Sequence, residues 1–140
     1  MKNLLDTNVI SELVAARPNE RVVAWIDAID PASVYLSVVT VGELAKGIAK
    51  LAESARKTAL HRWLTEDLLI RFDDNHILEL NVPVMLVWGE LVGRLERSGH
   101  PLPAMDSLIA AIALYHQCVL VTRNDADFRD TGVSVFNPWQ

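Results

Sequence analysis

Short apolar runs alternate with longer stretches of helical spacing along this sequence, and that alternation restricts the folds available to it. The apolar runs predict strands at residues 2–5, 34–38, 76–81, 118–122 and 133–136. Helical spacing predicts helices at residues 8–16, 20–29, 84–97 and 106–117, and a helical hairpin over residues 40–52 and 56–69. The alternation predicts an α/β fold in which helices cover both faces of a central parallel sheet of about five strands.

The composition fits one domain over residues 1–140. Although 51% of the residues are hydrophobic, no apolar run reaches the roughly 18 residues of a membrane span. The start of the chain also lacks the layout of a signal peptide, so we expect a cytoplasmic protein with no membrane partner. Cys118, the single cysteine, lies in an apolar run and is expected in the core rather than in a disulfide.

Acidic residues lie next to the predicted strands, where a parallel sheet gathers functional groups. Asp6 follows the first strand, and Glu43 lies on the first turn of the helix after the second strand. Asp106 opens the helix that leads into the fourth strand, and the segment 124–127 (Asn-Asp-Ala-Asp) follows that strand. Because the crevice of such sheets lies beyond the carboxyl ends of the strands, we expect these groups to meet at one edge.

Each of these acids also has a purely structural interpretation, which the sequence leaves open. Thr40 and Glu43 have the spacing of a capping box, in which two side chains satisfy backbone N–H groups at a helix start. Asp6 and Asp106 could each cap a helix, and the acids of segment 124–127 could be loop residues. Taken together, clustered carboxylates would repel one another by about 1 kcal/mol or more per close pair unless a cation or a proton intervenes.

The residue types favour a hard cation that binds oxygen. The sequence offers carboxylates without a cysteine cluster, and its four histidines are scattered. We therefore expect Mg²⁺, or alternatively Mn²⁺, rather than Zn²⁺. Such an ion binds phosphate oxygens and activates water, which favours phosphodiester hydrolysis. The sequence contains no phosphate-binding loop, no GxGxxG after the first strand and no recognisable Ser-His-Asp arrangement that would favour another chemistry.

Several blocks of the sequence resemble those of a known family, namely LLDTNVISEL, SVVTVGELAKGI, PAMDSLIAAIAL and VLVTRNDADF. They resemble the signature blocks of PIN-domain ribonucleases, and most closely those of VapC-type toxins from bacterial toxin–antitoxin pairs. The resemblance implies a single three-layer α/β/α PIN-like domain and a Mg²⁺-dependent endoribonuclease that is the toxin of a type II module. It also implies a cognate VapB-like antitoxin that blocks the site, and a toxin homodimer within a larger hetero-oligomer.

The resemblance also assigns roles to residues at the first three blocks. It makes Asp6, Glu43 and Asp106 the core catalytic acids, with Asp6 and Asp106 as the direct magnesium ligands. Thr7 and Asn8 match small polar residues beside the acids, which implies that they orient the carboxylates or a bound water. As turn and cap residues they have an equally simple structural role.

The last block departs from the family pattern. Family members often have an aspartate where this chain has Asn124, so the fourth catalytic acid would be Asp125 or Asp127. Asn124 could still bind a metal through its amide oxygen, though more weakly, and Thr122 is a further supporting residue. The departure favours an alternative function, a non-catalytic PIN-fold module that binds protein or RNA.

A polyanionic substrate would need cations beside the acids. Lys46 and Lys50 lie near one face of the helix that carries Glu43, and Arg123 adjoins the last acidic block. These three could contact RNA phosphates, or they could simply be solvated. The net charge of −5 disfavours nonspecific nucleic-acid binding across the whole surface. The hairpin also carries more apolar side chains than it can hide, which favours a partner helix in a groove: Leu44, Ile48, Leu51, Leu60 and Trp63.

Overall fold

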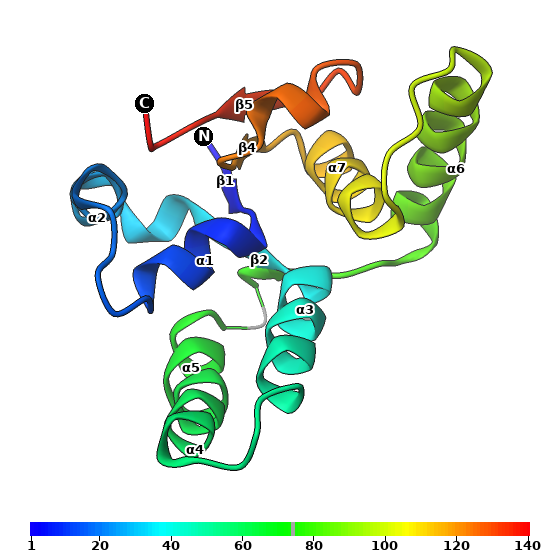
Figure 1. The fold of residues 1–140 in the computed structure, drawn as a ribbon. Coiled ribbons are helices and arrows are strands. Elements are labelled where there is room, and N and C mark those ends of the chain that lie inside the picture. Colours follow the sequence, from blue (N-terminus) through cyan, green and yellow to red (C-terminus); the bar gives the residue numbers. More distant parts are fainter. Residues whose placement is uncertain (74) are drawn as a thin grey trace.

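Five parallel strands form the centre of the protein in a computed structural model that describes residues 1–73 and 75–140. The strands are β1 (Asn3–Leu5), β2 (Val34–Ser37), β3 (Ile77–Leu78), β4 (Val119–Val121) and β5 (Ser134–Phe136). They lie in the order β3-β2-β1-β4-β5, with Leu4 of β1 opposite Tyr35 of β2 and Leu120 of β4 (Figure 1). The predicted parallel sheet is confirmed.

Helices cover both faces of this sheet, as the alternating pattern predicts. In Figure 1, α6 and α7 lie together on one side of the sheet and α1 and α2 on the other. The helices are α1 (Thr7–Leu13), α2 (Glu20–Ala28), α3 (Val38–Ala49), α4 (Ala55–Arg62), α5 (Leu69–Arg71), α6 (Val82–Arg97) and α7 (Ala104–His116). A π-helical segment, η2 (Trp63–Leu68), joins α4 to α5, and the 3₁₀ turns are η1 (Pro31–Ser33) and η3 (Asp125–Phe128). Within the described residues, every helix is too short or too polar to cross a membrane.

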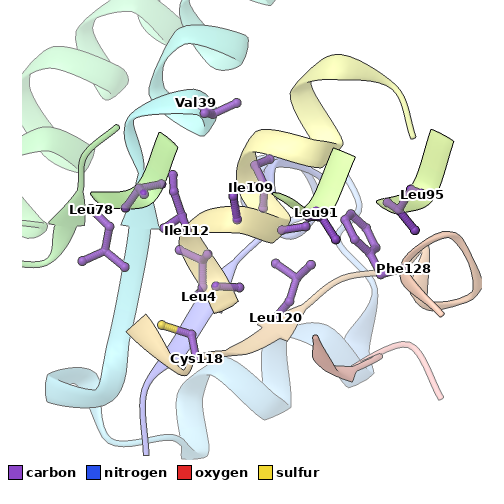
Figure 2. Packing of buried hydrophobic residues seen from close by; sticks show 14 residues of the cluster. Leu4, Val39, Leu78, Leu91, Leu95, Ile109, Ile112, Cys118, Leu120 and Phe128 are labelled. Atoms are coloured by element: carbon purple, nitrogen blue, oxygen red, sulfur yellow. The ribbon is translucent and has the colours of Figure 1, made fainter. Parts of the chain in front are cut away.

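The core has two layers because adjacent strand residues point to opposite faces of a sheet. Leu4 and Leu120 face α6 and α7, while Leu5 and Val121 face α1, α2 and the hairpin. Figure 2 shows the first layer, in which Cys118 is buried as the sequence predicts. The two layers hold the carboxyl ends of β1 and β4 side by side, which fixes the residues that follow them.

Several element boundaries differ from the sequence-based prediction. Helix α6 begins at Val82 because the Asn81 side chain accepts the Val84 N–H group at 3.1 Å. Helix α7 begins at Ala104, shortly before the predicted start at Asp106. The second arm of the hairpin, predicted as one helix, is divided by the η2 segment. Strand β3 is shorter than the predicted strand 76–81 because only Ile77 and Leu78 pair with β2.

Candidate active site at the carboxyl edge of the sheet

Asp6 lies where β1 and β4 end together, at the point where the strand order reverses direction. Its backbone N–H donates to the Val121 carbonyl at 2.9 Å, which extends the ladder between the two strands. Its carboxylate is buried and fully engaged: Oδ1 accepts the Thr7 N–H at 2.8 Å, and Oδ2 accepts the Thr122 hydroxyl at 2.8 Å and the Asn8 amide at 3.4 Å. Asp6 therefore caps α1 with one oxygen and presents a second oxygen held by side chains.

Glu43 does not form the capping box that its spacing from Thr40 allows. Ser37 caps α3 instead, because its Oγ accepts the Thr40 N–H at 3.1 Å. Glu43 Oε1 accepts a hydrogen bond from the Thr7 hydroxyl at 2.6 Å, across 36 residues of sequence. The glutamate is thus turned toward the end of β1 and away from its own helix start.

The hydroxyl groups behind Glu43 form a chain whose direction is fixed by proton count. A carboxylate has no proton to give, so Thr7 donates to Glu43 and must accept from Thr40 Oγ1, 3.0 Å away. Thr40, having given its proton to Thr7, accepts from Ser37 Oγ at 3.3 Å. Ser37 and Thr40 are fully buried, so this chain holds the Glu43 side chain in place from inside the protein.

Asp106 lies on the first turn of α7, but it does not cap the helix. The cap position is Pro103, which has no side-chain hydrogen bond to offer. The turn is held instead by Ser107, whose hydroxyl donates to the Ala104 carbonyl at 2.6 Å and accepts the Trp88 indole N–H at 2.9 Å. Burial, together with the charges of the surrounding acids, raises the pKa of Asp106 to about 6.

The pKa shifts of Asp6 and Asp106 show that the acids of the pocket repel one another. Burial is the main cause that raises the pKa of Asp6, and the charge of Glu43 raises it further. The hydrogen bonds from Thr122 and Thr7 oppose both effects. The repulsion on Asp106 comes, in decreasing order, from Asp6, Glu43 and Asp127. Negative charge from four chain segments is therefore concentrated at one edge of the sheet.

The residues of the last block occupy three different positions. Asn124 lines the pocket, and its N–H donates to Thr122 Oγ1 at 3.1 Å. Asp125 accepts the Asn137 amide at 3.3 Å. Asp127 is exposed on η3, close enough for its charge to raise the pKa of Asp106.

Asp6, Glu43 and Asp106 share an open pocket of about 470 Å³. It is lined by Asp6, Thr7, Asn8, Ser11, Glu12, Glu43, Asp106, Arg123 and Asn124. Over residues 1–73 and 75–140, no three histidine, cysteine or acidic side chains are close enough to hold a metal ion by themselves. Magnesium suits such an arrangement, because it retains several waters and uses only one or two protein carboxylates. An all-oxygen donor set under mutual repulsion fits a hard divalent cation.

Comparison with known proteins identifies the family. A family model described as PIN domain matches residues 4–133. The chain belongs to the PIN domain family. Among curated relatives of this PIN domain, the protein named Toxin FitB from Neisseria gonorrhoeae is 41% identical over 97% of each chain. The protein named VapC ribonuclease Y4jK from Sinorhizobium fredii is 34% identical over 98% of this chain and 97% of its own.

A solved structure agrees with the assignment. The crystal structure of FitAcB from Neisseria gonorrhoeae matches this PIN domain with a TM-score of 0.93 and 40% identity, and the match covers 99% of each chain. The match extends over the helical hairpin and the segment after β5. The three-layer α/β/α PIN-like fold expected from the signature blocks is therefore confirmed.

The cations near the pocket of this PIN domain fall into separate groups. Arg123 lines the acid pocket itself. Lys46 and Lys50 line a neighbouring, more apolar groove that shares Glu43 with it. In the next helix Lys57 is bound to Glu53 at 3.1 Å.

Some pocket residues were not found from the sequence. Ser11 and Glu12 line the pocket because α1 starts directly after Asp6 and its next turns run along the same rim. The Glu12 carboxylate accepts the Asn19 N–H at 2.9 Å. Helical spacing from Asp6 was the available signal for these two residues. The hydroxyl chain through Thr40 has no equivalent signal, because its contacts join elements distant in sequence.

Proposed function

We propose that this PIN domain is a Mg²⁺-dependent endoribonuclease that acts as the toxin of a type II toxin–antitoxin module. The observation that supports this proposal most is the meeting of Asp6, Glu43 and Asp106 in one pocket, where burial and the charges of the other two acids raise the pKa of Asp106. Relatives named as a toxin and as a VapC ribonuclease support the same reaction class.

Asp6 and Asp106 would hold the Mg²⁺ ion, or Mn²⁺ in its place, because both line the pocket and Asp6 is the strongest source of charge repulsion on Asp106. When bound, such an ion lowers the pKa of a coordinated water and stabilises the charge that develops on phosphorus. Thr122, Thr7 and Asn8 hold the Asp6 carboxylate in a fixed orientation. This preorganisation removes the cost of orienting the group during the reaction.

Glu43 is the acid best suited to accept a proton from a water near the phosphate. The hydroxyl chain leaves its second oxygen, Oε2, without a donor among the described hydrogen bonds, and the pocket is open to solvent there. Asn124 lines the pocket as a neutral support, and Asp127 serves as the fourth acid through its charge on Asp106. Asp125, which is engaged by Asn137, supports the block structurally.

Cations beside the acids would hold the RNA strand. Arg123 at the pocket and Lys46 and Lys50 in the adjoining groove flank the carboxylates on two sides. Contacts of these groups with phosphates would make binding depend on salt concentration.

A cognate VapB-like antitoxin would neutralise the toxin by filling an apolar groove next to the acids. The groove, of about 320 Å³, lies between α1 and the hairpin, and its lining includes Leu44, Ile48, Leu51, Leu60 and Trp63. Thr7 and Glu43 line both this groove and the acid pocket. An inserted segment would therefore lie against the catalytic glutamate. The toxin would form a homodimer within the larger complex.

The proposal is tested by cleavage of RNA with antitoxin-free protein. Cleavage should require Mg²⁺ or Mn²⁺ and stop with EDTA, and Asp6→Asn or Asp106→Asn should abolish it without loss of fold. Asp27→Asn, a change to an exposed carboxylate on α2, is the matched control and should retain activity. Full activity in both pocket variants would reject the assigned ligands.

A second candidate function is a non-catalytic PIN-fold module that captures RNA or protein. Asn124 favours it, because a neutral amide replaces a charged ligand in the pocket. This function predicts binding without turnover, and a melting temperature that does not respond to Mg²⁺.

A further inference from the structure

Arg123 is an exposed arginine that is held at three points. Its guanidinium lies 5.4 Å from the centre of the Trp139 ring, within the range of a cation–π interaction. Its backbone N–H donates to the Asn8 side-chain oxygen at 3.3 Å, and its backbone carbonyl accepts the Asn137 side-chain amide at 3.1 Å. The two hydrogen bonds fix the backbone, and the contact with Trp139 places the side chain, which in an exposed arginine normally samples many rotamers.

The segment after β5 supplies two of these contacts and is itself firmly fixed. Trp139 packs against the hydrophobic layer that includes Leu5 and Val121. Asn137 accepts the Trp139 N–H at 2.9 Å, and its amide group also donates to Asp125 at 3.3 Å. Because the Trp139 ring packs on the core and the Asn137 amide is also bound to Asp125, they can determine where the Arg123 side chain and backbone lie.

The position of Arg123 is unusual for its surroundings. It lines a pocket with Asp6, Glu43 and Asp106, and an arginine beside carboxylates ordinarily forms charge-assisted hydrogen bonds with them. Yet none of the ion pairs within 4.0 Å among the described residues includes Arg123. The Arg123 guanidinium therefore lies over the Trp139 ring and is not paired with the acids of the pocket.

We propose that Trp139 and Asn137 are positioning residues that hold Arg123 at the rim of the acid pocket, where its guanidinium binds a phosphate of the RNA strand. Without them the arginine would turn onto the carboxylates, neutralise them and withdraw from the substrate. This inference rests on the proposed function in taking RNA as the ligand. It adds a determinant of substrate binding that is not itself one of the pocket groups.

The test is a double-mutant cycle between Arg123→Ala and Trp139→Leu, with binding of a labelled single-stranded RNA measured by fluorescence anisotropy. All variants carry Asp106→Asn, so that cleavage does not consume the probe. Trp139→Leu keeps apolar bulk but removes the ring face, and it should weaken binding about two- to five-fold. The slope of log Kd against log salt should fall by about 0.7, which corresponds to one lost phosphate contact. In the Arg123→Ala background, Trp139→Leu should produce no further change.

Two controls separate positioning from loss of packing. Trp139→Phe keeps an aromatic face and should restore most of the affinity. Phe72→Leu removes a half-buried ring from the same hydrophobic layer, away from Arg123, and should leave Kd unchanged. In the active protein, Trp139→Leu should raise KM while kcat stays close to the parent value.

An equal loss of affinity from Trp139→Leu with and without Arg123 would overturn the inference, because a structural role acts in both backgrounds. Unchanged affinity in Trp139→Leu, or a parent that binds no RNA, would also overturn it. None of these binding results depends on cleavage. Metal-dependent cleavage by the otherwise unaltered chain separately decides the proposed function.

Discussion

Replacing Asp106 by asparagine should stabilise the metal-free protein at neutral pH. The pKa of Asp106 is raised from 3.8 to about 6 by burial and by neighbouring acids, so its ionised form is held at a cost in folding free energy. Without screening, a pKa difference of this size corresponds to about 3 kcal/mol of folding free energy. Because Asp106 is half-buried, solvent screening reduces the expected gain to about 1 kcal/mol. The melting temperature should rise by about 4 °C.

The gain should depend on pH in a defined direction. Between the unfolded value of 3.8 and the folded value of about 6, the pKa of Asp106 makes the folded state bind more protons than the unfolded state. The contribution of this carboxyl group to stability therefore rises as the pH falls through that window, and the penalty is complete above it. The advantage of Asp106→Asn should be largest above pH 6 and should disappear toward pH 4.

Thermal and urea unfolding in EDTA at several pH values measures this effect. Asp27→Asn serves as the control, because it removes an exposed carboxylate outside the pocket. Addition of Mg²⁺ should raise the melting temperature of the parent more than that of Asp106→Asn. A variant that is less stable than the parent at neutral pH, or a gain independent of pH, would refute the claim that the pocket concentrates negative charge.

Three further variants test other parts of the site and core. Thr40→Val breaks the hydroxyl chain to Glu43 and should cost about 1–3 kcal/mol in urea unfolding and slow cleavage, while Thr40→Ser should restore both. Asn124→Asp adds a carboxylate to the pocket, so the protein should melt lower in EDTA and gain more from Mg²⁺. Leu120→Ala leaves a cavity beneath α7 and should lower the free energy of unfolding by about 2–5 kcal/mol, measured by urea denaturation.

The order of strands and helices was predictable because each has its own hydrophobic period. The run VYLSV predicts β2 with an error of one residue, and the almost continuously apolar segment after Asp106 predicts the buried helix α7. The rule that crevices lie at the carboxyl ends of parallel strands predicts that Asp6, Glu43 and Asp106 meet at one edge, and the three line one pocket. Local patterns and one topological rule were sufficient for this part.

Tertiary contacts decided what the local patterns left open. Thr40 and Glu43 have the spacing of a capping box, but Ser37 caps α3, and Glu43 accepts the hydroxyl of Thr7 at the start of α1. The sequence around Glu43 does not indicate which group binds its carboxylate, because Thr7 is 36 residues away. The distinct positions of Asp125 and Asp127 depend likewise on Asn137 and on the 3₁₀ turn η3.

The three carboxylates of the pocket are chemically unequal, and that inequality bears on how a cation would bind. Burial raises the pKa of Asp6, and the hydrogen bonds from Thr122 and Thr7 oppose that effect, whereas Glu43 accepts one hydrogen bond from the hydroxyl chain. Asp106 accepts no hydrogen bond among those of the described residues, and with a pKa of about 6 it takes up a proton as the pH falls through that value. A divalent cation competes with that proton for the same charge. Metal binding should therefore weaken below pH 6 and release a proton there, with Asp106 as its source.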